Sequence, residues 1–195
     1  MAWTNPGNVV SSDNSRANAL MATGTVTDLN VQLSNSGGSG TWGGEDKASG
    51  SAWPATTDAT ATYGGASDLW SQSWSESDVE GGSFGAIVRV QTSNNSQYLW
   101  ATNYNFALTS GSTIDGIELA IERSTSTART GVNARVDHMP ITVYYTEPAA
   151  AWVPKIMLFA AAFAANLIPS LTAPFQALRL LPRKCSQTRT PQWVC

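Results

Sequence analysis

The pattern of apolar and polar residues along this chain is typical of β-strands joined by short turns. Its clearest example runs from Ser110 to Arg123, where Ile117, Leu119 and Ile121 alternate with Glu118, Ala120 and Glu122. Alternation of this kind turns one face of a strand toward an apolar core and the other toward water. Gly111 and Gly116 allow a tight entry into the strand. We expect the rest of the chain to be organised around this strand.

Further strands are predicted between the amino end and residue 147. Residues 26–33 place Leu29, Val31 and Leu33 on one face and Asp28, Asn30 and Gln32 on the other. Shorter or weaker strands are expected at 17–22, 59–63, 84–90, 98–106, 134–140 and 141–145, with a bend at 101–103 and a helical turn at 75–78. About seven or eight short strands separated by turn residues predict an all-β fold, an antiparallel β-sandwich or jelly roll.

Charge and composition change sharply near Pro148. Residues 1–147 contain 14 acidic and six basic residues, a net charge of −8, whereas residues 148–195 contain five basic residues, no acidic ones and six of the nine prolines. We therefore predict a β-sandwich domain over 1–147 and an apolar, Ala/Pro-rich C-terminal tail over 148–195 with a basic end.

The tail has three interpretations that the sequence leaves open. Its apolar run, residues 156–168, has 13 residues, fewer than the roughly 20 that span a bilayer. The alternatives are a membrane anchor over 149–168, a helix packed on the body or on a neighbouring subunit, and a non-native extension. We expect membrane insertion to be less favoured than packing on protein, although the apolar run keeps insertion among the alternatives.

Composition narrows the class of protein. Only 13% of the residues are charged, and Ser, Thr, Gly and Asn are abundant, as in many secreted, surface and virion proteins. The acidic body argues against nucleic acid as a partner, because such binding needs clustered cations. Both cysteines, Cys185 and Cys195, lie in the tail, so packing alone must hold the body. No basic or long apolar segment precedes Trp3, and we expect no secretory signal.

Candidate catalytic groups do not assemble into a known constellation. Gly38–Gly43 matches the dinucleotide pattern G-x-G-x-x-G, but residues 44–50 are not a helix-forming sequence, so we expect a loop. His138 follows Asp137 directly. Neighbours in a strand point to opposite faces, so these two side chains cannot form the histidine–acid relay of a serine hydrolase. Glu118 and Glu122 lie on one face but about 13 Å apart, too far for glycosidase chemistry.

Metal ligands are also lacking. Asp13, Asn14, Asp46 and Asp137 offer oxygen atoms, yet no calcium-binding run of spaced aspartates is present. We therefore predict that the protein is not an enzyme and uses no cofactor and no metal.

Four of the eight tryptophans, Trp42, Trp53, Trp70 and Trp74, lie in Gly/Ser-rich surroundings. They are the candidate ligand-binding residues, because an exposed indole can stack on a sugar ring or pack against a neighbouring subunit. The alternative, which we prefer, is that these side chains close the ends of the sandwich beneath its loops.

Several motifs resemble a family of β-sandwich domains found in tailed-phage structural genes and environmental viral sequences. They are Trp3–Pro6, Lys47–Pro54, Tyr63–Trp70, Phe84–Val88, Tyr98–Phe106 followed by Ser110–Arg123, and Arg135–Tyr145. The likeness covers residues 3–147 and implies a virion-associated or surface-exposed module. The order departs from the family, because the block of about 92–131 follows the block of about 26–91 as if the two were exchanged.

These observations predict a non-enzymatic structural protein, a virion-associated capsid decoration or a tail or fibre component. We expect its partners to be other virion or surface subunits in a homo-oligomer, and its location to be the virion or an extracellular surface. The alternative is a carbohydrate-binding module of a surface-exposed protein, with glycans as ligands of the tryptophans.

Overall fold

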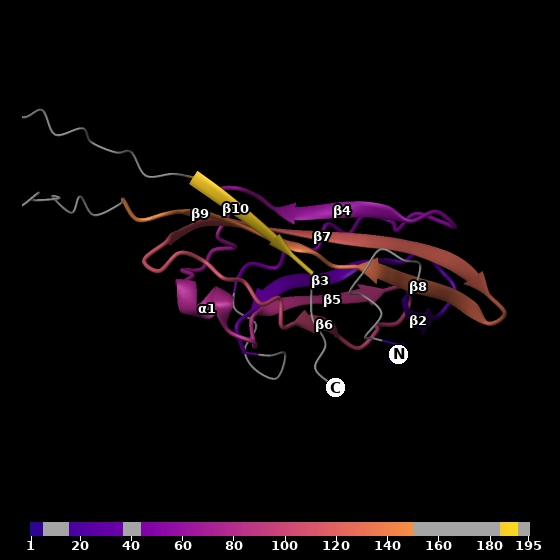
Figure 1. The fold of residues 1–195 in the computed structure, drawn as a ribbon. Coiled ribbons are helices and arrows are strands. Elements are labelled where there is room, and N and C mark those ends of the chain that lie inside the picture. Colours follow the sequence, from indigo (N-terminus) through magenta and orange to yellow (C-terminus); the bar gives the residue numbers. More distant parts are fainter. Residues whose placement is uncertain (6–15, 37–43, 150–183, 191–195) are drawn as a thin grey trace, which may run out of the picture.

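A computed structural model describes residues 1–5, 16–36, 44–149 and 184–190, which form two antiparallel β-sheets (Figure 1). The strands are β1 (Trp3–Thr4), β2 (Ala17–Met21), β3 (Thr27–Ser34), β4 (Ala59–Gly64), β5 (Gly85–Gln91), β6 (Leu99–Thr102), β7 (Thr113–Ala128), β8 (Gly131–His138), β9 (Ile141–Thr146) and β10 (Lys184–Arg189). One short helix, α1 (Glu76–Glu80), is also present in these residues. The predicted antiparallel β-sandwich is confirmed.

The large sheet is built around β7, the strand that the alternation pattern predicted most clearly. β4 pairs with one edge of β7, and β8 and β9 follow each other along the other edge. β2 then pairs with β8, and β10 with β9. Met139 and Pro140 separate β8 from β9, because proline has no amide hydrogen to continue the ladder. At 16 residues, β7 extends beyond the predicted strand to Ala128.

The small sheet contains β3, β5 and β6, in that order, and packs face to face with the large sheet (Figure 1). The outer edge of β3 is covered by the segment that follows it, because the amide of Lys47 donates to the Val31 carbonyl at 2.9 Å and the amide of Trp53 donates to the Val26 carbonyl at 2.9 Å. The small sheet is therefore protected on the β3 side.

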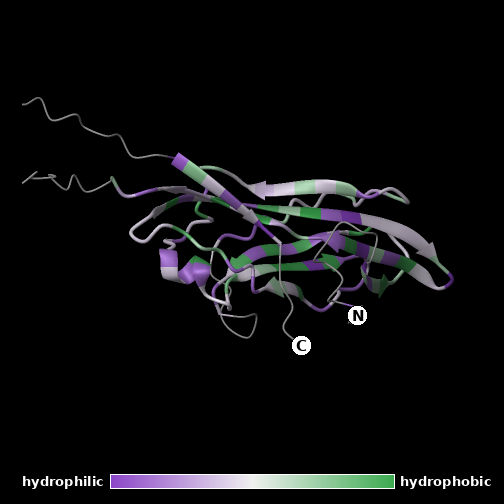
Figure 2. Ribbon diagram, viewed as in Figure 1, coloured by the Kyte–Doolittle hydropathy of each residue, from purple (hydrophilic) through white to green (hydrophobic). Residues whose placement is uncertain are grey.

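The core lies between the two sheets and is formed by alternate side chains of their strands. Figure 2 shows hydrophobic and hydrophilic residues alternating along these strands. The inward residues expose 1% or less of their surface and are Ala17, Ala19, Met21, Ile117, Leu119, Ile121, Ala134, Val136, Ile141 and Val143 from the large sheet, and Val31, Leu33, Ala86, Val88, Val90, Leu99 and Ala101 from the small sheet. Burial of this apolar surface is the main force that holds the sheets together.

One strand departs from the predicted alternation. A β-bulge between Asp28 and Asn30 shifts the register of β3 against β5, so Leu29 is the extra residue. Asp28 therefore faces the core at 2% exposure, and Leu29 is only half-buried. The prediction that Leu29 lies on the core face and Asp28 on the polar face was wrong, because a bulge reverses the faces of the residues on one side of it.

The aromatic segment 98–106 is also shorter than predicted as a strand. β6 ends at Thr102, and Asn103 and Asn105 adopt positive φ values of 58° and 51°. Asparagine tolerates this left-handed conformation better than most residues. The bend separates two exposed aromatic side chains before it from two buried ones, Tyr104 and Phe106, after it.

The helical turn predicted at residues 75–78 is confirmed as the start of α1. The Ser75 hydroxyl accepts a hydrogen bond from the Asp78 amide at 3.1 Å, and the Asp78 carboxylate accepts one from the Ser75 amide at 2.9 Å. This capping box satisfies two amides at the first turn.

Part of the predicted tail belongs to the large sheet. β10 pairs with β9 over six residues, and Cys185 packs against the core. β1 and β10 bring the strands to ten within the described residues, where the sequence predicted seven or eight. The apolar run 156–168 and the candidate loop Gly38–Gly43 lie outside the described residues. In the parts of the chain that are described, no helix is long and apolar enough to cross a membrane.

We expect truncation of a side chain in β7 to destabilise the fold only when that side chain faces the core. Leu119→Ala removes a fully buried side chain and should lower the free energy of unfolding by about 2–5 kcal/mol. Its neighbour Glu118 is half-exposed, so Glu118→Ala should change stability by less than about 0.5 kcal/mol. Urea denaturation followed by tryptophan fluorescence measures both, and equal losses would contradict the assigned faces of β7.

Candidate functional site

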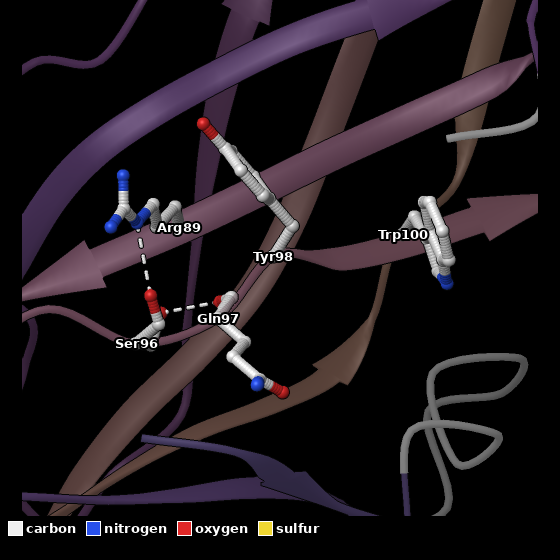
Figure 3. Close-up of a pocket in the computed structure, with 5 residues that line it drawn as sticks. All are labelled: Arg89, Ser96, Gln97, Tyr98 and Trp100. Carbon is white, nitrogen blue, oxygen red and sulfur yellow. Dashed lines mark hydrogen bonds between the residues drawn. The ribbon is translucent and has the colours of Figure 1, made fainter. Parts of the chain in front are cut away.

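A shallow groove lies on the outer face of the small sheet. It has a volume of about 440 Å³ and is lined by Arg89, Ser96, Gln97, Tyr98 and Trp100 (Figure 3). Arg89 belongs to β5, Trp100 belongs to β6, and the other three residues lead into β6. This groove is the candidate functional site.

The register of β5 and β6 places these side chains on one face. Val88 pairs with Leu99 and Ile87 with Trp100. Val88 and Leu99 point into the core, so the residues next to them, Arg89 and Trp100, point outward. Tyr98 lies two residues before Trp100 and shares its face. Tyr98 exposes 37% of its surface and Trp100 exposes 40%.

The groove is fixed by backbone and buried polar groups. The Arg89 Nε donates to the Ser96 carbonyl at 2.9 Å, and its guanidinium carbon lies 5.2 Å from the centre of the Tyr98 ring. The Ser96 hydroxyl, buried at 2% exposure, accepts from the Val90 amide at 3.0 Å and donates to the Gln97 carbonyl at 2.7 Å. These bonds hold the arginine and tyrosine in place before any ligand binds.

The amino end of the chain supports the same segment. The Gln97 amide donates to the Met1 carbonyl at 2.6 Å, and the indole nitrogen of Trp3 donates to the Gln97 carbonyl at 2.8 Å. Met1 and Trp3, far from Gln97 in the sequence, therefore help to hold the segment that lines the groove.

The tryptophans singled out from the sequence lie elsewhere. Trp53, Trp70 and Trp74 expose 5%, 0% and 9% of their surface, so they offer little or no free ring face to a ligand. Trp42 lies outside the described residues. This burial agrees with the alternative in which the indoles close the sandwich beneath its loops.

Each of these buried indoles has a hydrogen-bond acceptor inside the chain. Trp74 donates to the Leu69 carbonyl and Trp70 to the Ile117 carbonyl, both at 2.9 Å. Gly64 has a φ of +78°, and a Cβ at that position would collide with the Trp70 ring. The glycine at the end of β4 is therefore what lets this indole reach the central strand.

A second candidate is a buried ionic cluster between the sheets. The Arg123 Nη1 of β7 donates to the Asp28 carboxylate of β3, and the two side chains expose 7% and 0% of their surface. Trp53 donates to the same carboxylate at 2.7 Å, Tyr63 at 2.6 Å and Ser49 at 3.1 Å. The Arg123 guanidinium also lies 5.2 Å from the centre of the Trp53 ring.

The electrostatics of this cluster are those of a structural ion pair. Burial would raise the pKa of Asp28, but the hydrogen bonds from Tyr63 and Arg123 and the arginine charge outweigh it and hold that pKa below its usual range. Burial and the nearby carboxylate raise the pKa of the Tyr63 hydroxyl. Four side chains donate to one carboxylate, which satisfies its acceptor sites. The cluster therefore links the two sheets and presents no group to a substrate.

Other candidates from the sequence stay apart. His138 lies in β8, and burial lowers its pKa while the charges of Glu122 and Asp137 oppose that shift. Asp46 accepts hydrogen bonds from Asn30 and from the Val31 amide. Within the described ranges, no group of three or more His, Cys, Asp or Glu side chains is placed to hold a metal ion. Asp13 and Asn14 lie outside those ranges.

Comparison with known proteins gives no further guide to the site. None of the family models, curated proteins or solved structures compared with this chain matches it.

Removing one partner of the ionic cluster should destabilise the fold strongly. Arg123→Met leaves the Asp28 carboxylate buried without its cation, and we expect the free energy of unfolding at pH 7 to fall by about 3–5 kcal/mol. The double variant Asp28→Asn with Arg123→Met removes the stranded charge and should recover part of that loss. Urea denaturation compares them, and a double variant less stable than Arg123→Met would contradict this account.

The native chain and the Arg123→Met variant should also respond to pH in opposite ways. In the native chain the pKa of Asp28 is lowered, so its contribution is complete above the unfolded pKa of about 3.9 and is lost as the pH falls through the folded pKa. In Arg123→Met, protonation of the stranded carboxylate relieves its burial, so acid should favour the fold. The stability difference between the two proteins should therefore shrink from pH 7 to pH 5, and a constant difference would contradict the pairing.

Proposed function

We propose that this chain is a non-enzymatic structural protein, a virion-associated β-sandwich that serves as a capsid decoration or as a tail or fibre component. It assembles with copies of itself or with neighbouring subunits. The observation that carries the proposal is an open strand at the edge of the large sheet.

That strand is β4, which pairs with β7 on one side only. Among the described residues, no strand pairs with its other side. Four of its six residues, Ala59, Thr60, Thr62 and Gly64, are exposed. An open edge leaves backbone N–H and C=O groups free to pair with a strand of another chain.

The sequence of β4 does not block such pairing. The strand reads Ala-Thr-Ala-Thr-Tyr-Gly, with no charged residue and no proline. Monomeric β-proteins usually protect an edge with lysine, proline, a bulge or a covering loop, and in this protein a covering segment lies along β3. The contrast between the two edges favours β4 as a subunit contact. The resemblance to phage structural domains and the hydroxyl-rich composition support the virion assignment.

Assembly through β4 should be sensitive to charge on that edge. The native chain should form a concentration-dependent oligomer in sedimentation velocity, and Thr60→Lys with Thr62→Lys should weaken association at least tenfold, about 1.4 kcal/mol. Thr127→Lys is the matched control, because Thr127 is an exposed threonine of β7 within a paired strand. A native chain that stays monomeric, or a lysine variant that assembles normally, would refute the edge contact.

The virion assignment has its own test. Mass spectrometry of purified particles from the source of this sequence should detect its peptides at a stoichiometry of many copies per particle. Their absence from particles would refute that part of the proposal without affecting the edge contact.

Carbohydrate binding is a second proposed function, now favoured by a different observation. The tryptophans from which it was first inferred are buried or lie outside the described residues, but Tyr98 and Trp100 both line the groove and expose 37% and 40% of their surface. Exposed aromatic rings beside polar side chains are what sugar recognition requires.

A further inference from the structure

We propose that the partner of β4 is β4 of a second copy of this chain, paired antiparallel about a twofold axis that is normal to the sheet and passes beside Thr62. This pairing joins the two large sheets into one continuous sheet. The inference rests on the assembly through β4 proposed above, and it adds the identity of the partner, the direction of the strands and their register.

The backbone groups of β4 are divided between its two edges. The amide of Gly65, the residue directly after β4, donates to the Ile117 carbonyl of β7 at 3.1 Å in the same register as the strand. In an antiparallel ladder, every second residue bonds to the same neighbour. The odd-numbered residues of β4 therefore bond to β7, whereas Thr60, Thr62 and Gly64 direct their N–H and C=O groups toward the open edge.

The two faces of β4 favour an antiparallel partner. Tyr63 faces the core, where its hydroxyl donates to Asp28 at 2.6 Å, whereas Thr60 and Thr62 are exposed on the outer face. A twofold axis normal to the sheet keeps the core faces of both copies on one side of the joined sheet. A parallel pair, related by an axis along the strands, would place the core face of one copy beside the outer face of the other.

The register follows from where the open edge ends. Gly64 has a φ of +78° and is the last residue of β4. When Thr62 lies opposite Thr62 of the second copy, Thr60 lies opposite Gly64, so all three edge-facing residues form hydrogen-bonded pairs with the partner. A register centred on Ala61 would instead set Gly64 opposite Asp58, which lies before the strand.

The side chains of β4 suit a second copy. Residues 59–62 read Ala-Thr-Ala-Thr, so the antiparallel pair brings threonines together on the outer face, where a cross-strand pair contributes about 0.2–1 kcal/mol. Glu118 and Glu122 of β7 lie behind the edge, opposite Gly64 and Thr60. Three strand spacings, about 14 Å, separate these acids from those of the second copy. This distance exceeds the Debye length of about 8 Å at 0.15 M salt, so like charge does not prevent the pairing.

Hydrogen exchange followed by NMR tests which backbone groups take part. At concentrations where the full chain is associated, the amides of Thr60 and Thr62 should exchange about tenfold more slowly than in the dissociated chain, because in the dissociated chain they face water. The Ala61 amide is the internal control. It bonds to β7 in both states, so its exchange should change far less.

Complementary charges at position 62 test whether Thr62 faces itself. Thr62→Lys alone and Thr62→Glu alone should each weaken self-association about tenfold or more in sedimentation velocity, because like charges then lie directly opposite each other. An equimolar mixture of the two variants should associate about tenfold more tightly than either alone, because opposite charges then meet. Thr60→Lys mixed with Thr60→Glu is the matched control. Thr60 faces Gly64 in this register, so mixing should bring no comparable gain. Circular dichroism melting confirms that each variant is folded.

Three results would overturn this pairing in a chain that associates through β4. They are a mixture at position 62 that associates no better than its components, an equal recovery at position 60, and unchanged exchange of the Thr60 and Thr62 amides. If the combined Thr60→Lys and Thr62→Lys variant still weakens association in such a chain, the assembly proposal stands and only its partner or register is wrong. A native chain that stays monomeric overturns both.

Discussion

The ion pair between Asp28 and Arg123 is the constraint on which the arrangement of the two sheets depends. Each residue lies on a different sheet, and both side chains point into a core that is otherwise apolar. A buried charge is tolerated only when its partners are in place. The relative position of β3 and β7 is therefore limited to arrangements in which the carboxylate meets the guanidinium, whereas apolar contacts alone would allow the sheets to slide.

The same pair accounts for features that otherwise look unrelated. The bulge at Leu29 turns the carboxylate inward, and a second irregularity in the ladder of β7 and β8 falls between Glu122 and Arg123. Trp53 and Tyr63 come from a loop and from β4, and both direct their polar atoms to the carboxylate. These aromatic residues fill the space around the charges and exclude water, so the loop at residues 44–57 is held to the sandwich by the ions beneath it.

Local sequence patterns predicted most of the strands but not the buried ion pair between the sheets. The alternation in β7 and the capping box of α1 follow from neighbouring residues, so the sequence was sufficient for both. Period-two alternation could not predict that Asp28 points inward, because one inserted residue, Leu29, reverses the alternation of faces. Arg123 did carry a signal. It continues the odd-numbered series of Ile117, Leu119 and Ile121, and an arginine on a core face requires a buried acid.

The candidate groove was missed for a similar reason. Tyr98, Trp100, Tyr104 and Phe106 occupy even positions, yet the first two are exposed and the last two are buried. The difference arises at Asn103 and Asn105, where left-handed backbone redirects the chain. Which tryptophans face solvent depends on how loops from distant parts of the sequence fold over the sheet, and composition cannot supply that information.

Strand β10 has a consequence for synthesis of the protein on the ribosome. Thr142 and Thr188, whose hydroxyls lie 2.7 Å apart across β9 and β10, are separated by 46 residues. At about 5–20 residues per second, roughly 2–9 seconds pass between the emergence of the two strands. During that interval β9 is outside the ribosomal exit tunnel, but its free edge has not yet paired with β10. In a polysome, adjacent nascent chains expose the same edge at the same time, so correct closure depends on capture of β10 by its own chain before another chain reaches it.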